Sequence, residues 1–156
     1  MDERITKVEK NLMMGSGKWI ADFNESFKSF KVRDVEFDMF IRGNTRTKGF
    51  FLSKLFSATV NPNYSVGCFI TSSDSVKVDR KFLGKAVAEI HSYMKDNEMK
   101  WSWFLIFMTK DIGEMGKQVE SIKDQNIGVV LVDVSSGSII HSNSYLARQA
   151  KRYVKL

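Results

Sequence analysis

The sequence has little of what cross-links, interrupts or anchors a chain. It contains one cysteine, Cys68, so no internal disulfide can form. Its single proline, Pro62, rules out a proline-rich linker and favours one α/β domain over residues 1–156. No stretch approaches the roughly 18 uninterrupted apolar residues of a membrane span. The opening MDERITKVEK has no apolar signal-peptide core. We therefore expect a cytoplasmic protein with no membrane partner.

Several kinds of enzyme site also lack their residues. The two histidines, His91 and His141, have no cysteine or histidine neighbour at the spacing of a zinc site. There is no G-x-S-x-G nucleophile turn, no P-loop and no G-x-G-x-x-G fingerprint. The sequence thus gives no support to zinc enzymes, serine hydrolases or nucleotide-cofactor enzymes.

What is present is positive charge, unevenly distributed. The net charge is +6, and no acidic residue follows Asp133. Arg148, Lys151, Arg152 and Lys155 then fall on one face of the helix expected at the C-terminal end. Such a stripe favours a polyanionic partner. It is equally typical of the solvated face of a terminal helix.

The hydrophobic pattern predicts an α/β domain with a mixed central sheet flanked by helices. Apolar periodicity places antiparallel hairpins first and β-α-β units later, and crossover helices imply parallel neighbours. The N-terminal helical segment, residues 1–30, packs on this sheet. The expected helices are 2–13, 18–30, 79–97, 112–126 and 144–154, and the expected strands are 32–41, 49–57, 65–73, 101–109, 127–134 and 138–142.

The stretch VEFDMFIRGNTRTKGFF, beginning at Val35, carries the strongest chemical pattern. Read as a strand, one face has three carboxylates, which repel one another unless a cation or water surrounds them. Hard oxygen ligands of this kind suit Mg²⁺. The pattern therefore indicates either a metal-binding face or a solvated outer face. The acidic face is Asp34, Glu36 and Asp38, and the apolar face is Val35, Phe37 and Met39.

A basic turn follows that strand. Gly43 and Asn44 tolerate the left-handed backbone of a hairpin, so RGNTRTKG is predicted to turn. It would bring Arg42, Arg46 and Lys48 together at an exposed tip. Phosphate contacts use such tips, although ordinary solvated turns have the same composition.

These residues carry a resemblance to a known superfamily. The strand VEFDMF, the basic turn, a further strand, the long helix and the closing WFLIFMT and IGVVLVDVSSGSI resemble the restriction-endonuclease-like, PD-(D/E)xK nucleases over about residues 33–142. The resemblance implies that superfamily's fold and Mg²⁺-assisted phosphodiester hydrolysis. In that chemistry the metal activates water and offsets charge on the phosphate.

The resemblance also implies roles for particular residues. Asp38 matches the metal-binding aspartate of the first strand, and Glu36 is the neighbouring acid. Lys54 in FFLSKLF matches the catalytic lysine, but Leu52 stands where the second acid belongs. The implied catalytic set is Asp38, Glu36 and Lys54, with the metal on Asp38 and Glu36. The departure at Leu52 implies a degenerate member or an atypical Mg²⁺-dependent nuclease.

Three functions remain open. The first is a nucleic-acid-binding protein of nuclease-like fold that is degenerate or an atypical nuclease. The second is a non-enzymatic protein-interaction or homodimerising α/β domain that uses a sheet edge with Trp101, Trp103 and Phe104. The third is a small-molecule or regulatory α/β domain, which requires a closed apolar pocket.

Overall fold

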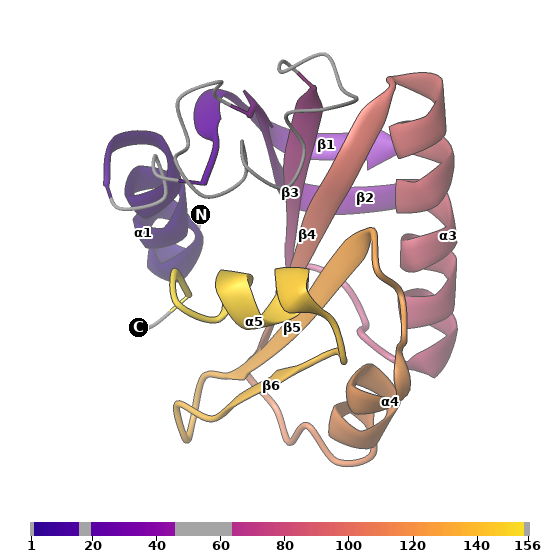
Figure 1. Ribbon diagram of the computed structural model, residues 1–156. Helices are drawn as coiled ribbons and strands as arrows, with labels where there is room; N and C mark the ends of the chain where they lie inside the picture. Colours follow the sequence, from indigo (N-terminus) through magenta and orange to yellow (C-terminus); the bar gives the residue numbers. More distant parts are fainter. Residues whose placement is uncertain (1, 16–19, 46–63, 155–156) are drawn as a thin grey trace.

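A computed structural model describes residues 2–15, 20–45 and 64–154. Within these ranges the chain forms one six-stranded sheet in the order β1-β2-β3-β4-β5-β6, with four helices (Figure 1). Three pairs of neighbouring strands are antiparallel, and the pairs β3–β4 and β4–β5 are parallel. The expected mixed α/β sheet is therefore confirmed. The strands are Asp22–Val32 (β1), Val35–Asn44 (β2), Ser65–Ser72 (β3), Met99–Met108 (β4), Ile127–Asp133 (β5) and Ile139–His141 (β6).

The helices cover both faces of the sheet (Figure 1). Helices α1 and α5 share one hydrophobic cluster with the sheet, and α3 and α4 share the other. None of the described helices is long and apolar enough to cross a membrane. The helices are Glu3–Met14 (α1), Arg80–Asp96 (α3), Met115–Ser121 (α4) and Tyr145–Ala150 (α5).

The helix expected at 18–30 is wrong, because its described part is mainly strand β1. Phe27 and Phe30 sit three residues apart, as on a helix, yet they pair across β2 with Phe40 and Phe37. A register shift after Phe23 and a left-handed Ser29 (φ 50°) interrupt the strand's alternation. These two irregularities give a strand the apolar spacing of a helix.

The turn expected at Gly43–Asn44 is also wrong. Both residues belong to β2 and pair with Val66 and Ser65 of β3. A Cβ on Gly43 would lie 2.8 Å from the carbonyl oxygen of Asp22, so this glycine allows close strand approach. The turn before β2 is instead Arg33–Asp34, where Arg33 has φ 50°.

The second half of the chain follows its pattern closely. Strands β3, β4 and β5 are buried along nearly their whole length, as continuous apolar runs predict for the centre of a sheet. Asp79 caps α3 by accepting a hydrogen bond from Phe82 N–H at 2.8 Å. The helix expected at 112–126 is shorter, Met115–Ser121. The expected strand 49–57 lies outside the described residues.

Candidate functional site

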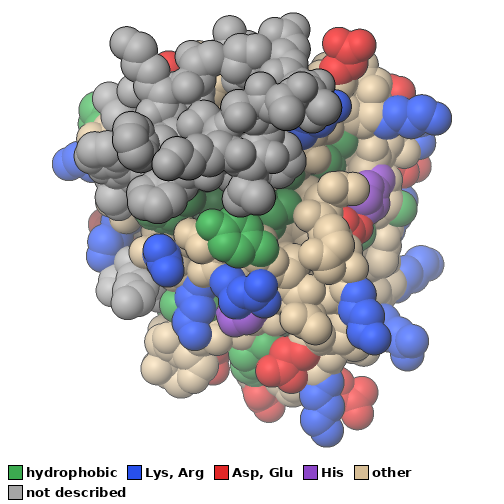
Figure 2. Space-filling view, in the orientation of Figure 1, with side chains coloured by type: hydrophobic (Ala, Val, Ile, Leu, Met, Phe, Trp, Pro, Cys, Tyr) green, Lys and Arg blue, Asp and Glu red, His purple; other side chains and the backbone are tan. Residues whose placement is uncertain are grey.

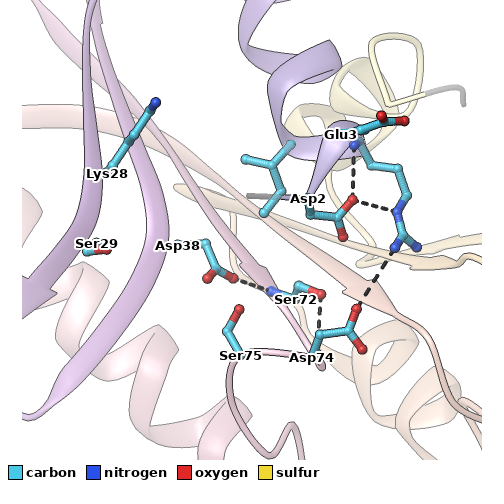
Figure 3. A pocket seen from close by; sticks show the side chains of 10 residues that line it. Asp2, Glu3, Lys28, Ser29, Asp38, Ser72, Asp74 and Ser75 are labelled. Carbon is cyan, nitrogen blue, oxygen red and sulfur yellow. Dashed lines mark hydrogen bonds and ion pairs between the residues drawn. The ribbon is translucent and has the colours of Figure 1, made fainter.

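An open pocket of about 680 Å³ lies between the first turn of α1 and strands β1, β2 and β3 (Figure 3). It sits at the carboxyl end of β3, which is the edge where open α/β sheets commonly bind ligands. All of its lining residues except Ile5 are polar or charged, and they include both acidic and basic side chains. The lining residues are Asp2, Glu3, Arg4, Ile5, Lys28, Ser29, Asp38, Ser72, Asp74 and Ser75.

Asp38 is held rigidly in this pocket. Its Oδ2 accepts a hydrogen bond from the backbone N–H of Ser72 at 2.7 Å. The alternation of β2 slips beside it, because Phe37 and Phe40 both pack toward α3 whereas Met39 packs toward α1. The expectation that Met39 shares a face with Phe37 is therefore wrong. The slip lies opposite the left-handed Ser29 of β1, which also lines the pocket.

A network of polar side chains joins α1 to the ends of β3 and β4. Asp2 Oδ1 accepts bonds from the backbone N–H of Arg4 at 3.0 Å and from Arg4 Nε at 2.7 Å. Arg4 Nη2 lies 3.9 Å from Asp74 Oδ2. On the far side, Thr109 Oγ1 donates to Asp74 Oδ1 at 2.6 Å. These groups cross-link the rim of the pocket and neutralise part of its negative charge.

The other two acids of the predicted carboxylate face do not join Asp38 in this pocket. Asp34 lies in the β1–β2 turn, 3.8 Å from Lys85 Nζ on α3. Glu36 is exposed opposite Lys31 of β1 and does not line the pocket. The described residues contain no group of three or more His, Cys, Asp or Glu side chains arranged to hold a metal ion.

Strand β3 supplies no partner for a metal beside Asp38. On the face toward α1, β3 carries Cys68, Ile70 and the pocket residue Ser72. Its sequence, SVGCFITS, contains neither a carboxylate nor a lysine. The predicted Lys54 lies outside the described residues, as does Leu52.

Arg42 is not at an exposed tip. It lies on β2, where its Nη2 donates to Tyr93 Oη at 2.9 Å and its Nη1 lies 3.5 Å from Glu25 Oε2. Its guanidinium carbon is 5.8 Å from the centroid of the Phe27 ring and 5.9 Å from that of Phe40. These contacts engage Arg42 within the fold. Arg42 does not project from a turn. The structure therefore does not support its place in the expected cluster with Arg46 and Lys48. The last two residues lie outside the described ranges.

The cations at α5, which are Arg148 in the helix and Lys151 and Arg152 in the turn after it, are arranged differently. Arg148, Lys151 and Arg152 are exposed, and none forms an ion pair within the described part of the chain. Figure 2 shows Lys and Arg side chains gathered over and beside α5. The expected single helix face is not formed, because α5 ends at Ala150 and Lys151 and Arg152 follow it in a turn. The fourth predicted cation, Lys155, lies outside the described residues.

The aromatic residues proposed as a docking surface lie in the core. Trp103 and Phe104 are at most 1% exposed, and Trp101 is 8% exposed. The Trp101 and Trp103 rings are 5.1 Å apart, and Trp103 also stacks on Tyr153 at 5.8 Å. They therefore belong to the packed interior of the described fold rather than to an exposed apolar surface. Burial also raises the pKa of the Cys68 thiol, which removes it as a reactive nucleophile.

Sequence reasoning missed the α1 side of the pocket. Asp2 and Arg4 lie at the start of α1, and the sequence pattern of this helix indicated only its buried apolar face. Asp74 lies in the turn after β3. The position of Asp74 was one available signal. It comes two residues after β3, and the carboxyl end of a parallel strand is where open α/β sheets commonly bind ligands. Nothing in the linear sequence joins α1 to that edge.

Comparison with protein families, with curated proteins and with solved structures finds no match to this chain. The described geometry therefore stands without a relative whose activity could be transferred to it.

Proposed function

We propose that this protein binds nucleic acid through a nuclease-like α/β fold and does not hydrolyse it. The observation that carries the proposal is the surface of α5. Arg148, Lys151 and Arg152 are exposed there without ion pairs among the described residues, in a segment with no acidic residue after Asp133. Unpaired exposed cations are the groups that displace counterions from phosphates.

The nuclease-like part of the proposal rests on topology and on Asp38. In the described residues, antiparallel strands precede the crossover helix α3 and the parallel strands, which is the general order of the resemblance, while the strand expected at 49–57 lies outside the described residues. Asp38 lies on the second strand of this array and lines a polar pocket. Its position is compatible with the metal-binding aspartate of the restriction-endonuclease-like superfamily.

We propose that the protein does not hydrolyse nucleic acid because of the groups that surround Asp38. One of its oxygens is already bonded to the Ser72 N–H. The resemblance puts the acid and lysine positions at Leu52 and Lys54, which lie outside the described residues, and β3 brings only Ile70 and Ser72 beside this part of β2. Mg²⁺ prefers several hard oxygen ligands, and no second carboxylate ligand comes from this strand. Should Mg²⁺ bind nonetheless, Asp38 is the residue that would hold it and the metal would activate water.

The test measures binding and cleavage together. Labelled single-stranded, duplex and branched DNA, and RNA, are incubated with the protein with and without Mg²⁺ or Mn²⁺ at two salt concentrations. We expect binding that weakens steeply with salt and no cleavage. Failure to bind any of these at low salt would sink the proposal and leave protein interaction as the better interpretation.

Two variants sharpen the result. If metal-dependent cleavage does occur, Asp38→Asn abolishes it when Asp38 holds the metal, and unchanged cleavage excludes Asp38 from the mechanism. Charge reversal at Arg46 and Lys48 is expected to weaken binding irrespective of nucleotide sequence. An unchanged affinity and salt slope in that variant would exclude these two residues from the contact surface.

A further inference from the structure

On the face of the sheet covered by α1 and α5, acidic residues gather at one end and are lacking at the other. At its carboxylate end, Asp2 and Glu3 open α1 beside the pocket that contains Asp38. Beyond Glu9 the chain has no acidic residue until Asp22, and it has none after Asp133. The two acid-free segments, 10–21 and 134–156, are distant in sequence.

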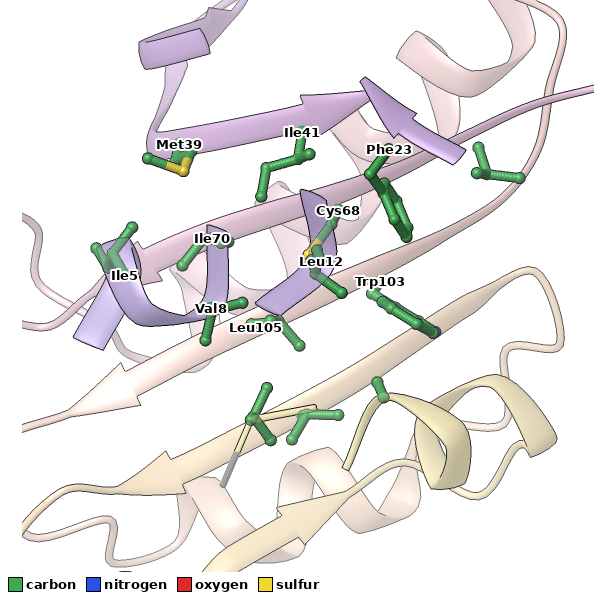
Figure 4. Packing of buried hydrophobic residues seen from close by; sticks show 14 of the residues in the cluster. Ile5, Val8, Leu12, Phe23, Met39, Ile41, Cys68, Ile70, Trp103 and Leu105 are labelled. Carbon is green, nitrogen blue, oxygen red and sulfur yellow. The ribbon is translucent and has the colours of Figure 1, made fainter. Parts of the chain in front are cut away.

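These segments meet on the same face. Figure 4 shows Ile5 at the Ile70 end of β3 and Leu12 near Cys68 and Trp103, so α1 runs antiparallel to β3. The five residues belong to one hydrophobic cluster, which also contains the buried residues of α5. The carboxyl-terminal half of α1 therefore points toward the part of the face that α5 covers.

Helix α5 packs over the amino end of β5 and the middle of β4. A Cβ on Gly128 would lie 2.6 Å from the backbone nitrogen of Ala147, so α5 rests directly on β5 at this glycine. Gly128 pairs with Trp103 of β4, and the Trp103 ring stacks on Tyr153 just beyond α5. The cations of α5 thus lie at the opposite edge from Ser72 and the Asp38 pocket.

Lys10 of α1 and Tyr145 of α5 are exposed on the same side of the sheet as these cations. Lys10 is exposed on the outer side of α1, opposite its buried stripe, and forms no ion pair with another described residue. It lies about 10 Å along the helix axis from Glu3. Tyr145 is 59% exposed and stands three residues before Arg148, on the same side of α5.

Tyr145 is close to one of these cations. Tyr145 and Arg148 are three residues apart on α5 and therefore lie next to each other on the surface of this helix. An exposed aromatic ring among unpaired cations is the combination that stacks an unpaired base while cations hold the phosphates.

We infer that a single-stranded nucleic acid binds along Lys10, Tyr145, Arg148, Lys151 and Arg152, at the edge of the sheet away from the Asp38 pocket. This inference rests on the proposed function and adds its contact surface and the form of its partner. A duplex offers the cations its phosphates but keeps its base faces stacked, so Tyr145 has nothing to stack on. The carboxylates of the pocket repel phosphate, so binding requires neither Asp38 nor a metal.

The experiment measures fluorescence anisotropy of a labelled oligothymidylate and of a duplex of equal length, without divalent metal, on the full chain. Lys10→Glu with Lys151→Glu is expected to weaken single-strand binding about tenfold or more. The matched control is Lys81→Glu with Lys95→Glu on α3, an equal change in net charge on the opposite face. It should change the affinity less than about twofold. Circular dichroism checks that both variants are folded.

Tyr145 separates the two forms of nucleic acid. Tyr145→Ala should weaken single-strand binding about fivefold or more and leave duplex binding unchanged, while Tyr145→Phe retains the wild-type affinity. If Lys10→Glu with Lys151→Glu (the α1–α5 variant) and the α3 control lose the same amount of single-strand affinity, the proposed contact surface is wrong, although the protein still binds nucleic acid. If Tyr145→Ala binds the oligothymidylate as tightly as the unsubstituted protein, the assignment to single-stranded nucleic acid is wrong.

A third arm uses vesicles of phosphatidylcholine with and without phosphatidylserine, because cations beside an exposed tyrosine also suit an anionic lipid surface. Binding to the anionic vesicles without binding to any oligonucleotide overturns both this inference and the proposed function. Binding to oligothymidylate with loss in the α1–α5 variant supports both.

Discussion

The Asp38 carboxylate and the Ser72 backbone N–H, 34 residues apart, form a 2.7 Å hydrogen bond that ties the start of β2 to the end of β3. Ser72 is 1% exposed in the intact fold, so Asp38 is the group that satisfies its N–H. The residue that looks most catalytic in the sequence therefore has a structural task. This bond also limits what Asp38 can offer a metal, because one oxygen is already occupied.

We predict that Asp38→Ala lowers the free energy of unfolding by about 1–3 kcal/mol, since it removes the charged acceptor of this hydrogen bond. Asp38→Asn keeps an acceptor oxygen and should lose clearly less. Urea unfolding followed by circular dichroism measures both. Glu36→Gln is the control, because Glu36 is exposed, and it should change the value by about 0.5 kcal/mol or less. Equal losses for Asp38→Ala and Glu36→Gln would show that the bond to Ser72 contributes nothing.

The sequence predicts the buried part of the fold better than its edge. Strands β3, β4 and β5 and helix α3 follow from continuous apolar runs, a 3.6-residue period and the cap at Asp79. Strand β1 was missed because its register shift and the left-handed Ser29 give its phenylalanines helical spacing. The same irregularity hid the true face of Met39. Local irregularities of this kind are set by tertiary pairing, which the linear pattern does not contain.

The residues of the candidate site were also predicted only in part. Asp38 could be singled out because an acid on an apolar strand is chemically conspicuous. Arg42 was misassigned because its partners, Tyr93 and Glu25, come from α3 and β1. The polar rim at Asp2 and Asp74 depends on the docking of α1 against the end of β3, a contact between segments far apart in sequence.

A second prediction concerns the side-chain pair His91 and Asp124, which fastens α3 to the segment before β5. Asp124 Oδ1 also accepts hydrogen bonds from the N–H groups of Asn126 at 2.8 Å and Ile127 at 3.0 Å. Removing Asp124 thus breaks three hydrogen bonds, whereas removing His91 breaks one. We expect Asp124→Ala to destabilise the protein by about 1–3 kcal/mol and His91→Ala by about 0.5–1 kcal/mol.

Thermal unfolding at neutral pH measures this order. The double variant should lose little more than Asp124→Ala alone, since His91 has no partner once Asp124 is gone. Additive losses in the double variant would mean that the two side chains stabilise the fold independently.

A third prediction uses the lowered pKa of Asp133. The Ser135 and then the Ser136 hydroxyl donate to its carboxylate, which lowers its pKa from 3.8 to about 2. Since the folded pKa is the lower one, this contribution to stability is complete above pH 3.8 and is lost as the pH falls through 2. Carboxyl ¹³C shifts report the titration, and Ser135→Ala with Ser136→Ala should move it back toward the ordinary value.

Ser121→Ala is the control for that titration, because the Ser121 hydroxyl donates to the carbonyl oxygen of Gln118 and not to a carboxylate. Its Asp133 midpoint should equal that of the unsubstituted protein. An unchanged midpoint in the double serine variant would mean that the turn hydroxyls do not stabilise the carboxylate.

The fourth prediction compares two glycines with opposite surroundings. A Cβ on Gly128 would lie 2.6 Å from Ala147 N and 2.8 Å from the carbonyl carbon of Leu146, both backbone atoms, so α5 must shift. Gly128→Ala should therefore lower the free energy of unfolding by about 1–3 kcal/mol. On the exposed side of α3, a Cβ on Gly84 would meet no atom within 4 Å, and Gly84→Ala should raise that free energy by up to about 1 kcal/mol. Urea unfolding of both variants measures the difference. If Gly128→Ala were as stable as the unsubstituted protein, α5 would not rest on β5 as described, and the cation surface that depends on α5 would lose its foundation.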